Sequence, residues 1–141
     1  MDNMIFRAIV KEDLDEIFLL LQQLTEIYYS DRDKEKCWEL FSSSSSHSSV
    51  GVLKNKIVAY GSLVLEYKIR GEVAGHIEDI VVDKSIRGKN VGINLISKLI
   101  DLARGLECYR VTLLCDESLI NFYSKNNLKV SGVAMKKFIN K

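Results

Sequence analysis

The sequence predicts one α/β domain, in which a mixed central β-sheet is flanked by helices. Apolar residues switch between helical spacing and β-prone runs in the order β, α, α, β, β, β, α, β, α, β. A strand–helix–strand unit stands at the centre of that order, at residues 73–115. The 141 residues suffice for one ordinary domain, which we place at residues 1–141.

The composition argues against several classes of partner. Apolar residues make up 47% of the chain and charged residues 28%, which is typical of soluble globular proteins. The net charge of +1 favours neither nucleic acid nor an anionic membrane surface. No apolar run reaches the length of a membrane span, and the first residues lack the pattern of a secretory signal, so we expect neither.

Cysteine and histidine usage bears on the compartment and on metals. The three cysteines are odd in number and lack a Cys-x-x-Cys spacing, which indicates reduced thiols and a cytoplasmic protein. The two histidines do not stand in a ligand-spaced cluster, so we expect no metal site.

The first third of the chain predicts a short strand and two helices. β-prone residues at 5–10 precede a stretch, from about Asp13 to Tyr28, in which apolar residues recur at helical spacing. Asp33 is placed to cap a second helix with its carboxylate. The inner face of that helix would hold Cys37, Trp38 and Phe41.

The serine-rich run Ser42–Ser49 predicts a flexible loop. Serine competes with the backbone for hydrogen bonds and offers little apolar surface to a core. A phosphorylated switch is the less favoured alternative.

The remaining elements follow from β-prone runs, turn residues and helical periodicity. They are a hairpin of strands at 50–53 and 57–67 around the turn Lys54–Lys56, a polar loop at 68–72, a strand at 73–82, a helix at 91–105 closed by Gly105, a strand at 108–115, a short helix at 118–126 and a last strand at 130–138.

The segment Arg87-Gly88-Lys89-Asn90-Val91-Gly92 is the central chemical signal. It joins a strand end to a helix start, where the first backbone N–H groups have no internal partner and carry the positive end of the helix dipole. Small residues let a phosphate approach those groups, and Arg87 and Lys89 add two cations. An ordinary helix start is the alternative, because the segment has neither a P-loop nor a GxGxxG pattern.

Two segments resemble the GNAT acetyltransferase superfamily. Its loop pattern, (Gln or Arg)-x-x-Gly-x-(Gly or Ala) after a strand, is similar to Arg87–Gly92, and its Phe-Tyr-x-Lys-x-Gly-Phe segment is similar to Asn121–Leu128. Asn90 and Asn127 replace glycines of these patterns, and asparagine tolerates left-handed backbone. Further segments resemble one family within the superfamily, the glucosamine-6-phosphate N-acetyltransferases of eukaryotes. These segments are Gln23–Thr25, Gly75–Ile80, Glu107–Arg110, Cys115–Glu117, Phe122–Tyr123 and Gly132–Met135.

The resemblance implies the GNAT fold and the transfer of acetyl from acetyl-CoA to the 2-amine of glucosamine 6-phosphate by direct attack, in UDP-N-acetylglucosamine biosynthesis. Tyr123 would act at the sulfur as general acid or stabiliser of the thiolate. Glu78 and Asp79 would meet the sugar from a bulged strand, since adjacent strand residues otherwise point to opposite faces. The residues implied to bind acetyl-CoA are Ile80, Val81, Val82, Arg87, Gly88, Lys89, Asn90, Val91, Gly92 and Tyr123.

The resemblance also implies how the sugar phosphate is held. Its cations would come from the loop after the third strand and from the partner subunit of a homodimer formed through the last strands. Leu114 stands at a position that is usually acidic in the family, and Phe138 at one that is usually arginine, where Lys136 or Lys137 would compensate. The residues implied to bind this amino-sugar phosphate are Thr25, Lys68, Arg70, Glu78, Asp79, Tyr109 and Arg110.

Plainer interpretations stand beside these roles. Glu78 and Asp79 are also compatible with a solvated strand end, and Tyr123 with a packed aromatic side chain. Two other functions remain open: a GNAT enzyme for another small amine or a peptide, and a non-catalytic acyl-CoA-binding module.

Overall fold

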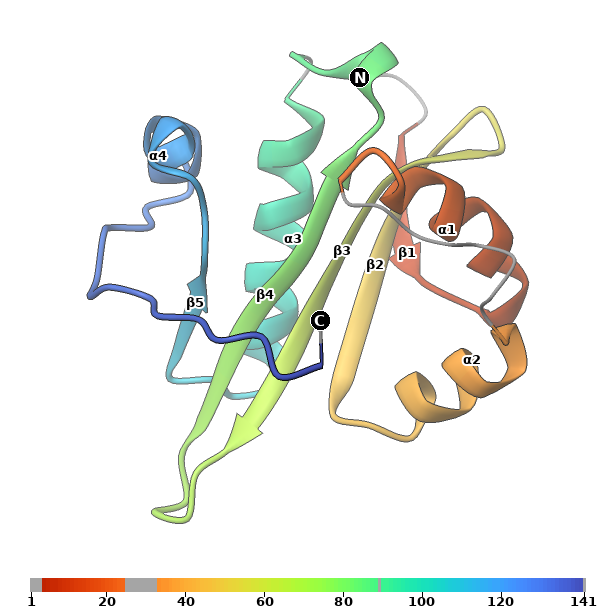
Figure 1. Ribbon diagram of the computed structural model, residues 1–141. Helices are drawn as coiled ribbons and strands as arrows, with labels where there is room; N and C mark the ends of the chain where they lie inside the picture. The colour runs from red at the N-terminus through yellow and green to blue at the C-terminus, as the bar shows by residue number, and fades with distance from the viewer. Residues whose placement is uncertain (1–3, 25–32, 89, 141) are drawn as a thin grey trace.

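A mixed β-sheet forms the centre of the protein, whose computed structural model describes residues 4–24, 33–88 and 90–140. Within this part of the chain, five strands lie in the order β1-β2-β3-β4-β5, and every neighbouring pair is antiparallel except β4 and β5 (Figure 1). The predicted mixed sheet is therefore confirmed. The strands are β1 (Ile5–Ala8), β2 (Ser46–Leu53), β3 (Lys56–Tyr67), β4 (Val73–Val82) and β5 (Arg110–Leu113).

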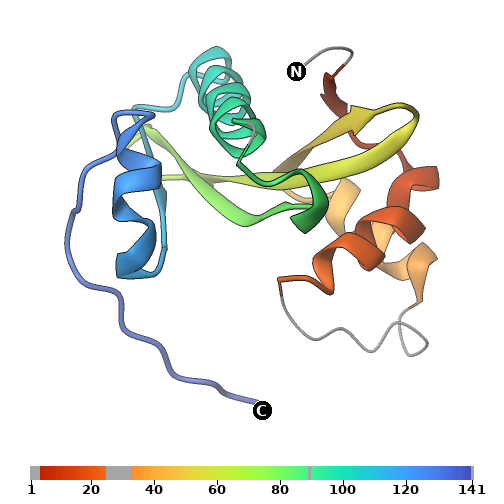
Figure 2. The same cartoon turned by 90° about the horizontal axis from the view of Figure 1, so that it is seen from above.

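Helices cover both faces of the sheet. α3 (Val91–Gly105) lies on one face and connects β4 to the parallel β5, while α1 (Leu14–Leu21) and α2 (Lys34–Ser42) lie on the other (Figure 2). The unit β4–α3–β5 is the strand–helix–strand unit that the sequence predicts. The remaining helical elements are α4 (Ile120–Ser124) and the short 3₁₀ helices η1 (Lys11–Asp13), η3 (Lys84–Ile86) and η4 (Glu117–Leu119).

The core consists of two groups of buried side chains, one on each face of the sheet. Leu95 and Leu99 of α3 pack in one group with Leu63 of β3, and all three are fully buried. Ile17 of α1 packs in the other group with Val50 of β2. α1 and α3 each bury an apolar stripe, as their periodicity predicts. α2 has no fully buried residue, and its expected inner face of Cys37, Trp38 and Phe41 is only half-buried.

The hairpin of β2 and β3 turns at Lys54 and Asn55. Both residues have positive φ, 50° and 63°, which is the backbone of a two-residue turn that matches the twist of its strands. Leu53 pairs with Lys56 across it. The hairpin predicted at this place is confirmed.

The serine-rich run is not a flexible loop, contrary to expectation. The hydroxyls of Ser42, Ser43 and Ser44 each donate to a carbonyl oxygen in the last turns of α2, at 2.6–2.7 Å. The rest of the run opens β2, where the buried Ser48 Oγ lies 2.8 Å from the Tyr60 hydroxyl. Strand partners on both sides, β1 and β3, satisfy the backbone that composition alone assigned to a loop.

Several boundaries differ from the prediction by a few residues. α1 ends at Leu21, where the next backbone hydrogen bonds, from Gln23 N and Leu24 N, take a 3₁₀ pattern. The sequence predicts that the helix reaches Tyr28, and positions 25–28 of that prediction lie outside the described residues. Asp33 caps α2 as expected, its Oδ1 accepting from Lys36 N at 3.1 Å. β5 is shorter than the predicted strand at 108–115.

The strand predicted at 130–138 does not form. The chain after α4 runs along the outside of the molecule as an extended, irregular segment and ends away from the sheet (Figure 2). A strand requires a neighbour for its backbone N–H and C=O groups, and within the described residues this segment has none. Its large apolar side chains are more than 60% exposed: Val130, Val133, Met135, Phe138 and Ile139.

An ion pair ties β1 to the start of the first helical segment. Arg7 Nη1 and Nη2 donate to the two carboxylate oxygens of Asp13 at 2.8 and 2.9 Å, and Val10 N donates to the same carboxylate at 2.8 Å. Asp13 is 7% exposed. The hydrogen bonds from Arg7 hold the pKa of Asp13 below its ordinary value.

We therefore expect Asp13→Asn to lower the free energy of unfolding by about 2–3 kcal/mol in urea titration at pH 7, because it breaks charge-assisted bonds at a buried group. The carboxylate's contribution is full above the unfolded-state pKa, near 4, and is lost as the pH falls through the lower folded-state pKa. The difference between wild type and variant should shrink over that acid range.

The matched control is Asp101→Asn, which breaks the exposed pair between Asp101 and Arg104 on α3. We expect it to cost less than about 0.5 kcal/mol. Equal losses in the two variants would show that burial of Asp13 contributes nothing special.

Candidate functional site

A β-bulge in β4 sets the geometry of the site. Tyr60 of β3 pairs with Val81 and Ser62 pairs with Glu78, so Gly61 alone faces the two residues between them on β4. One of these, Asp79, has φ +53°, in the left-handed region that asparagine and aspartate tolerate better than most residues. The bulge expected from the two adjacent carboxylates is confirmed.

The bulge changes which way the β4 side chains point. Glu78 and Asp79 are consecutive, yet both are exposed. The next residue, Ile80, turns toward α3: a Cβ added at Gly61 would lie 2.5 Å from Ile80 Cδ1 and 2.9 Å from Leu99 Cδ1. Only glycine leaves room for Ile80 there, and Gly61 was not among the residues that the sequence singled out.

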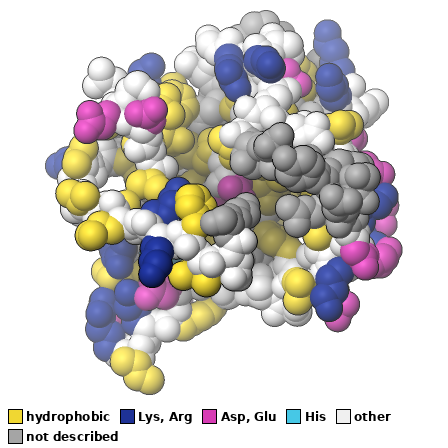
Figure 3. Space-filling model, viewed as in Figure 1, with side chains coloured by type: hydrophobic (Ala, Val, Ile, Leu, Met, Phe, Trp, Pro, Cys, Tyr) yellow, Lys and Arg dark blue, Asp and Glu magenta, His cyan; other side chains and the backbone are white. Residues whose placement is uncertain are grey.

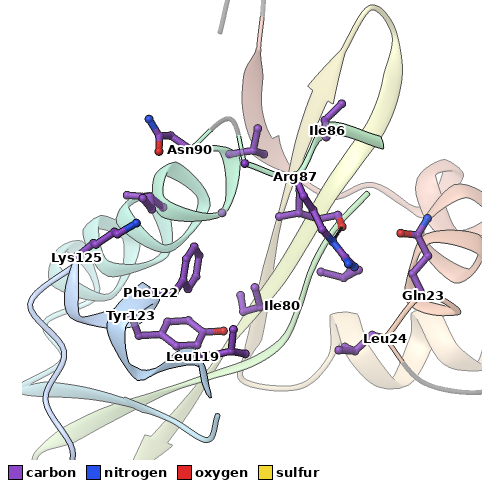
Figure 4. Close-up of a pocket in the computed structure, with 16 residues that line it drawn as sticks. Gln23, Leu24, Ile80, Ile86, Arg87, Asn90, Leu119, Phe122, Tyr123 and Lys125 are labelled. Atoms are coloured by element: carbon purple, nitrogen blue, oxygen red, sulfur yellow. Dashed lines mark hydrogen bonds between the residues drawn. The ribbon is translucent and has the colours of Figure 1, made fainter. Parts of the chain in front are cut away.

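Beyond the bulge, β4 and β5 separate. The two strands pair only over Ala74–Ile77 and Arg110–Leu113. The second half of β4 therefore has no strand neighbour on this side within the described residues. Residues of α4 and of the start of α3 face that open part of β4 across a cavity (Figure 4).

The cavity has a volume of about 540 Å³ and is mostly lined by apolar groups. Of the residues predicted to bind acetyl-CoA, all except Lys89 line it, and Lys89 lies outside the described residues. The sequence missed a further group, contributed by the end of α1, by η3, by α3 and by the region of α4: Gln23, Leu24, Ile86, Ile93, Leu119, Phe122 and Lys125.

The loop between β4 and α3 has two described residues in left-handed backbone. Gly88 has φ +85° and Asn90 has φ +61°, so the asparagine fits the position of the family's glycine. Asn90 precedes the first residue of α3, and its side chain makes no capping hydrogen bond. The first backbone N–H groups of α3 are thus left without a side-chain cap, which suits the binding of an anion.

Tyr123 lies in α4 and is 9% exposed. Its ring meets the Phe122 ring edge-on, with centroids 4.9 Å apart, and its hydroxyl points into the cavity on the side of Ile80 (Figure 4). Burial raises the pKa of the Tyr123 phenol, and the neighbouring Cys115 raises it further. The phenol therefore keeps its proton at neutral pH and can donate it.

A glycine also places α4. A Cβ at Gly92, in the first turn of α3, would lie 2.8 Å from Phe122 Cζ. The absence of a side chain at Gly92 lets the Phe122 ring rest on α3, and this contact brings the adjacent Tyr123 to the cavity. The position of the Tyr123 phenol therefore depends on the packing of α4 against the first turn of α3, which directly follows the loop at 87–90.

The predicted sugar-binding residues fall into two places. Glu78 and Asp79 lie next to Ile80, at the edge of the cavity, although neither lines it. Thr25 lies outside the described residues. The other four lie together at the opposite end of β4, near the β3–β4 turn: Lys68, Arg70, Tyr109 and Arg110.

The cations of this second place form a cluster around Tyr109. Its hydroxyl accepts from Arg110 Nε at 2.7 Å and from Arg70 Nη2 at 3.0 Å, and both guanidinium groups lie over its ring. The hydrogen bond from Arg110 lowers the pKa of Tyr109. Lys68 pairs with Glu66 at 2.8 Å, and Arg70 with Glu72. Figure 3 shows basic side chains gathered at this lower end of the molecule.

About 20 Å of strand separates this cluster from the carboxylates, because Val73 and Asp79 are six residue steps apart at about 3.3 Å per step. One copy of the chain therefore does not bring the four residues to the cavity. A histidine stands between the two places. His76 Nδ1 lies 2.8 Å from Thr112 Oγ1 and Nε2 lies 2.7 Å from Glu66 Oε1, whose pKa falls to about 2 through Lys68 and His76.

Across residues 4–24, 33–88 and 90–140, His, Cys, Asp and Glu side chains nowhere gather in a group of three suited to a metal ion. None of the helices in those ranges is both long and apolar enough to span a bilayer.

Comparison with known proteins places the chain in a family. The acetyltransferase (GNAT) family model matches residues 12–127. Glucosamine 6-phosphate N-acetyltransferase 1 of Dictyostelium discoideum is 37% identical over 144 residues, covering 95% of this chain and 90% of that protein. Glucosamine 6-phosphate N-acetyltransferase of Candida albicans is 37% identical over 139 residues, covering 92% of each.

Solved structures agree with the sequence comparison. The crystal structure of glucosamine-6-phosphate N-acetyltransferase from Arabidopsis thaliana superimposes with a TM-score of 0.90 at 29% identity, over 99% of this chain and 100% of that one. A Trypanosoma brucei acetyltransferase gives a TM-score of 0.87 at 27% identity, over 97% of this chain and 100% of that one. The chain therefore belongs to the acetyltransferase (GNAT) family and is an acetyl-CoA-dependent N-acetyltransferase.

Proposed function

We propose that the protein transfers the acetyl group of acetyl-CoA to the 2-amine of glucosamine 6-phosphate. The observation that carries this proposal is the bulge, which presents Glu78 and Asp79 side by side where β4 leaves the cavity at Ile80. The similarity to the enzymes of that name from Dictyostelium discoideum and Candida albicans supports the same acceptor.

Acetyl-CoA would enter along the open part of β4. The uncapped N–H groups of α3 and the Arg87 guanidinium would hold its diphosphate. Arg87 lines the cavity and its Nε donates to Val82 O at 3.2 Å, which leaves its terminal nitrogens available for an anion. The backbone of Ile80, Val81 and Val82 would face the pantetheine and the thioester.

The two carboxylates would bind the sugar. An amino sugar offers hydroxyl donors and an amine, and carboxylate oxygens accept hydrogen bonds from both. Within the described residues, neither Glu78 nor Asp79 takes part in an ion pair, so both are free for such contacts. Holding the amine beside the thioester turns a bimolecular encounter into a positioned one.

The chemistry would be a direct transfer. The neutral amine nitrogen attacks the thioester carbon, and the carbonyl oxygen becomes an oxyanion. This attack forms the C–N bond. The intermediate then collapses as the oxyanion re-forms the C=O bond and the C–S bond breaks. The sulfur leaves with its electron pair and takes the Tyr123 proton, while the amine gives up its extra proton to water or to a neighbouring backbone carbonyl.

The phosphate of the sugar would require a second copy of the chain. The cluster around Tyr109 lies about 20 Å from the carboxylates of its own copy. The exposed apolar segment at 130–139 is suited to pairing with a partner, and so is the outer edge of β5, which has no further strand beside it among the described residues. Both features support a homodimer. Analytical ultracentrifugation should give a mass of about twice the 16.1 kDa of one chain. A monomeric mass would contradict the proposed binding of the sugar phosphate between two chains.

A cytoplasmic location fits this function. Cys37, Cys108 and Cys115 are all free thiols. Unpaired cysteines are typical of reducing compartments, where acetyl-CoA and sugar phosphates are both at hand.

An acceptor panel tests the proposed function. Release of the CoA thiol should be rapid with glucosamine 6-phosphate, at least about tenfold slower in kcat/KM with unphosphorylated glucosamine, and absent with peptide amines, because a lost charged contact costs about 1.5–3 kcal/mol. A preference for another amine would show that glucosamine 6-phosphate is not the acceptor. Acetyl-CoA binding without turnover on any amine would indicate a non-catalytic binding module instead.

The carboxylates can be removed one at a time. Glu78→Gln and Asp79→Asn should raise the KM for the sugar about tenfold or more and leave the KM for acetyl-CoA within about twofold. Asparagine at 79 retains the tolerance of left-handed backbone that this position requires. Loss of acetyl-CoA affinity in either variant would assign that residue to the fold rather than to the sugar.

Tyr123→Phe isolates the phenol. We expect kcat to fall about a hundredfold, as for the loss of a general acid, while the dissociation constant for acetyl-CoA changes less than about threefold. Phe122→Leu serves as the contrasting variant, because it disturbs the packing against Gly92 and should lower melting temperature and activity together. Equal losses of binding and turnover in Tyr123→Phe would contradict its role as acid.

A further inference from the structure

A side-chain bridge links the end of α1 to the turn that precedes the loop at 87–92. Gln23 follows α1, and its own backbone N donates to Leu20 O at 3.0 Å. Its side-chain Oε1 accepts from Lys84 N at 3.0 Å, across 61 positions of sequence. Gln23 also lines the cavity, on the wall opposite α4 (Figure 4).

The turn that Gln23 contacts, at residues 83–86, also makes hydrogen bonds to β3 and within itself. Asp83 N donates to Val58 O of β3 at 2.7 Å, and Asp83 Oδ1 accepts from both Ser85 N and Ser85 Oγ, at 2.9 and 2.8 Å. Ile86 anchors the turn in the core on the α3 side. The backbone and hydroxyl of Ser85 are the main groups that lower the pKa of Asp83, and the Gln23 amide lowers it further.

Val58 of β3 and the Asp83 side chain hold the turn from the sheet and from within. The hydrogen bond from Lys84 N to Gln23 Oε1 is the contact that holds the turn from the α1 side. Arg87 follows the turn directly, and Gly88 and Asn90 then take left-handed backbone into α3. The orientation of the turn therefore sets where the loop begins.

We propose that Gln23 is a positioning residue for acetyl-CoA: its amide clamps the turn at 83–86 to the end of α1 and thereby preforms the loop at 87–92. The proposal rests on the use of acetyl-CoA by this cavity. The amide suits the place because its oxygen accepts from Lys84 N, and because it lies close enough to the Asp83 carboxylate to help lower the pKa of that group. An amide satisfies a donor and an anion together, which neither a carboxylate nor an apolar side chain does.

The first test removes the amide without removing its volume. Gln23→Met should weaken acetyl-CoA binding in calorimetry about three- to tenfold, as expected for one lost hydrogen bond, and leave kcat within twofold at saturating acetyl-CoA. Gln22→Met is the matched control: Gln22 is the exposed neighbour, and its variant should bind acetyl-CoA like the wild type. Equal affinities of Gln23→Met and wild type would overturn the proposal.

A charge exchange separates positioning from direct contact with acetyl-CoA. Gln23→Glu keeps the acceptor for Lys84 N but sets a second carboxylate against Asp83, so it should weaken acetyl-CoA binding. Adding Asp83→Asn restores an amide–carboxylate pair with the partners reversed, and asparagine still accepts from Ser85 N. The double variant should therefore bind acetyl-CoA within about twofold of the wild type.

The charges around Gln23 set the last control. Lys56 of β3, Asp83, Lys84 and Arg87 all lie on elements that border this place, so a general change of net charge must be distinguished from the specific pair. Asp83→Asn alone should not tighten acetyl-CoA binding, because it removes the carboxylate whose charged form the Gln23 amide helps to stabilise. If Asp83→Asn improves binding equally in both backgrounds, the effects are additive and the proposal is wrong.

Failure of the proposed function would look different. A wild-type protein that binds no acetyl-CoA in calorimetry would remove the cosubstrate itself. A wild type that binds acetyl-CoA but acetylates a different amine would change the acceptor and leave the role of Gln23 unaffected. Melting temperatures of the variants, measured without ligand, would show whether each is folded.

Discussion

The extra residue in β4 opposite Gly61 is the constraint on which the site depends. In a regular strand, residues 78 and 80 would share one face and residue 79 the other. With the bulge, Ile80 turns into the α3 side of the sheet while both carboxylates stay in solvent. An apolar wall and a polar edge therefore meet at one point of one strand, and β4 leaves β5 just there.

Close packing then brings the remaining groups to that point. Two glycines contribute because they have no side chain: Gly61 leaves space for Ile80, and Gly92 leaves space for Phe122. A methyl group at either position would push against a partly buried side chain that packs on the core, Ile80 or Phe122. The phenol of Tyr123 owes its position to the same packing, because its neighbour Phe122 rests on the first turn of α3.

Two features of the chain underlie the proposed dimer. The cations around Tyr109 lie at the far end of β4, and apolar side chains are exposed along residues 130–139. The exposed apolar surface is unfavourable in isolation. The guanidinium groups of Arg70 and Arg110, which share Tyr109, repel each other. A second copy of the chain would cover the apolar segment at 130–139. It would also bring a bound sugar phosphate to the cations around Tyr109, which is why we propose that the phosphate lies between two chains.

The chemical segments could be recognised from the sequence because each is local. The loop at 87–92, the Glu78–Asp79 pair and the Phe122–Tyr123 pair are runs of neighbouring residues, and apolar periodicity placed them on a loop, a strand and a helix. The same periodicity located the β2–β3 hairpin and the α3 crossover, since both are built from residues near one another in the chain.

Contacts between distant residues had to come from the folded chain. Nothing in the composition of Ser42–Ser49 indicates that β1 and β3 flank it, so a strand was taken for a loop. The pairing of Gln23 with Lys84 is invisible for the same reason. Residues 130–138 show the opposite case: their pattern is that of a strand, but in the described part of the chain they pair neither with the outer edge of β5 nor with any other strand. A periodic pattern predicts which face of a helix or strand is apolar. Only the folded sheet determines whether another element packs against that face.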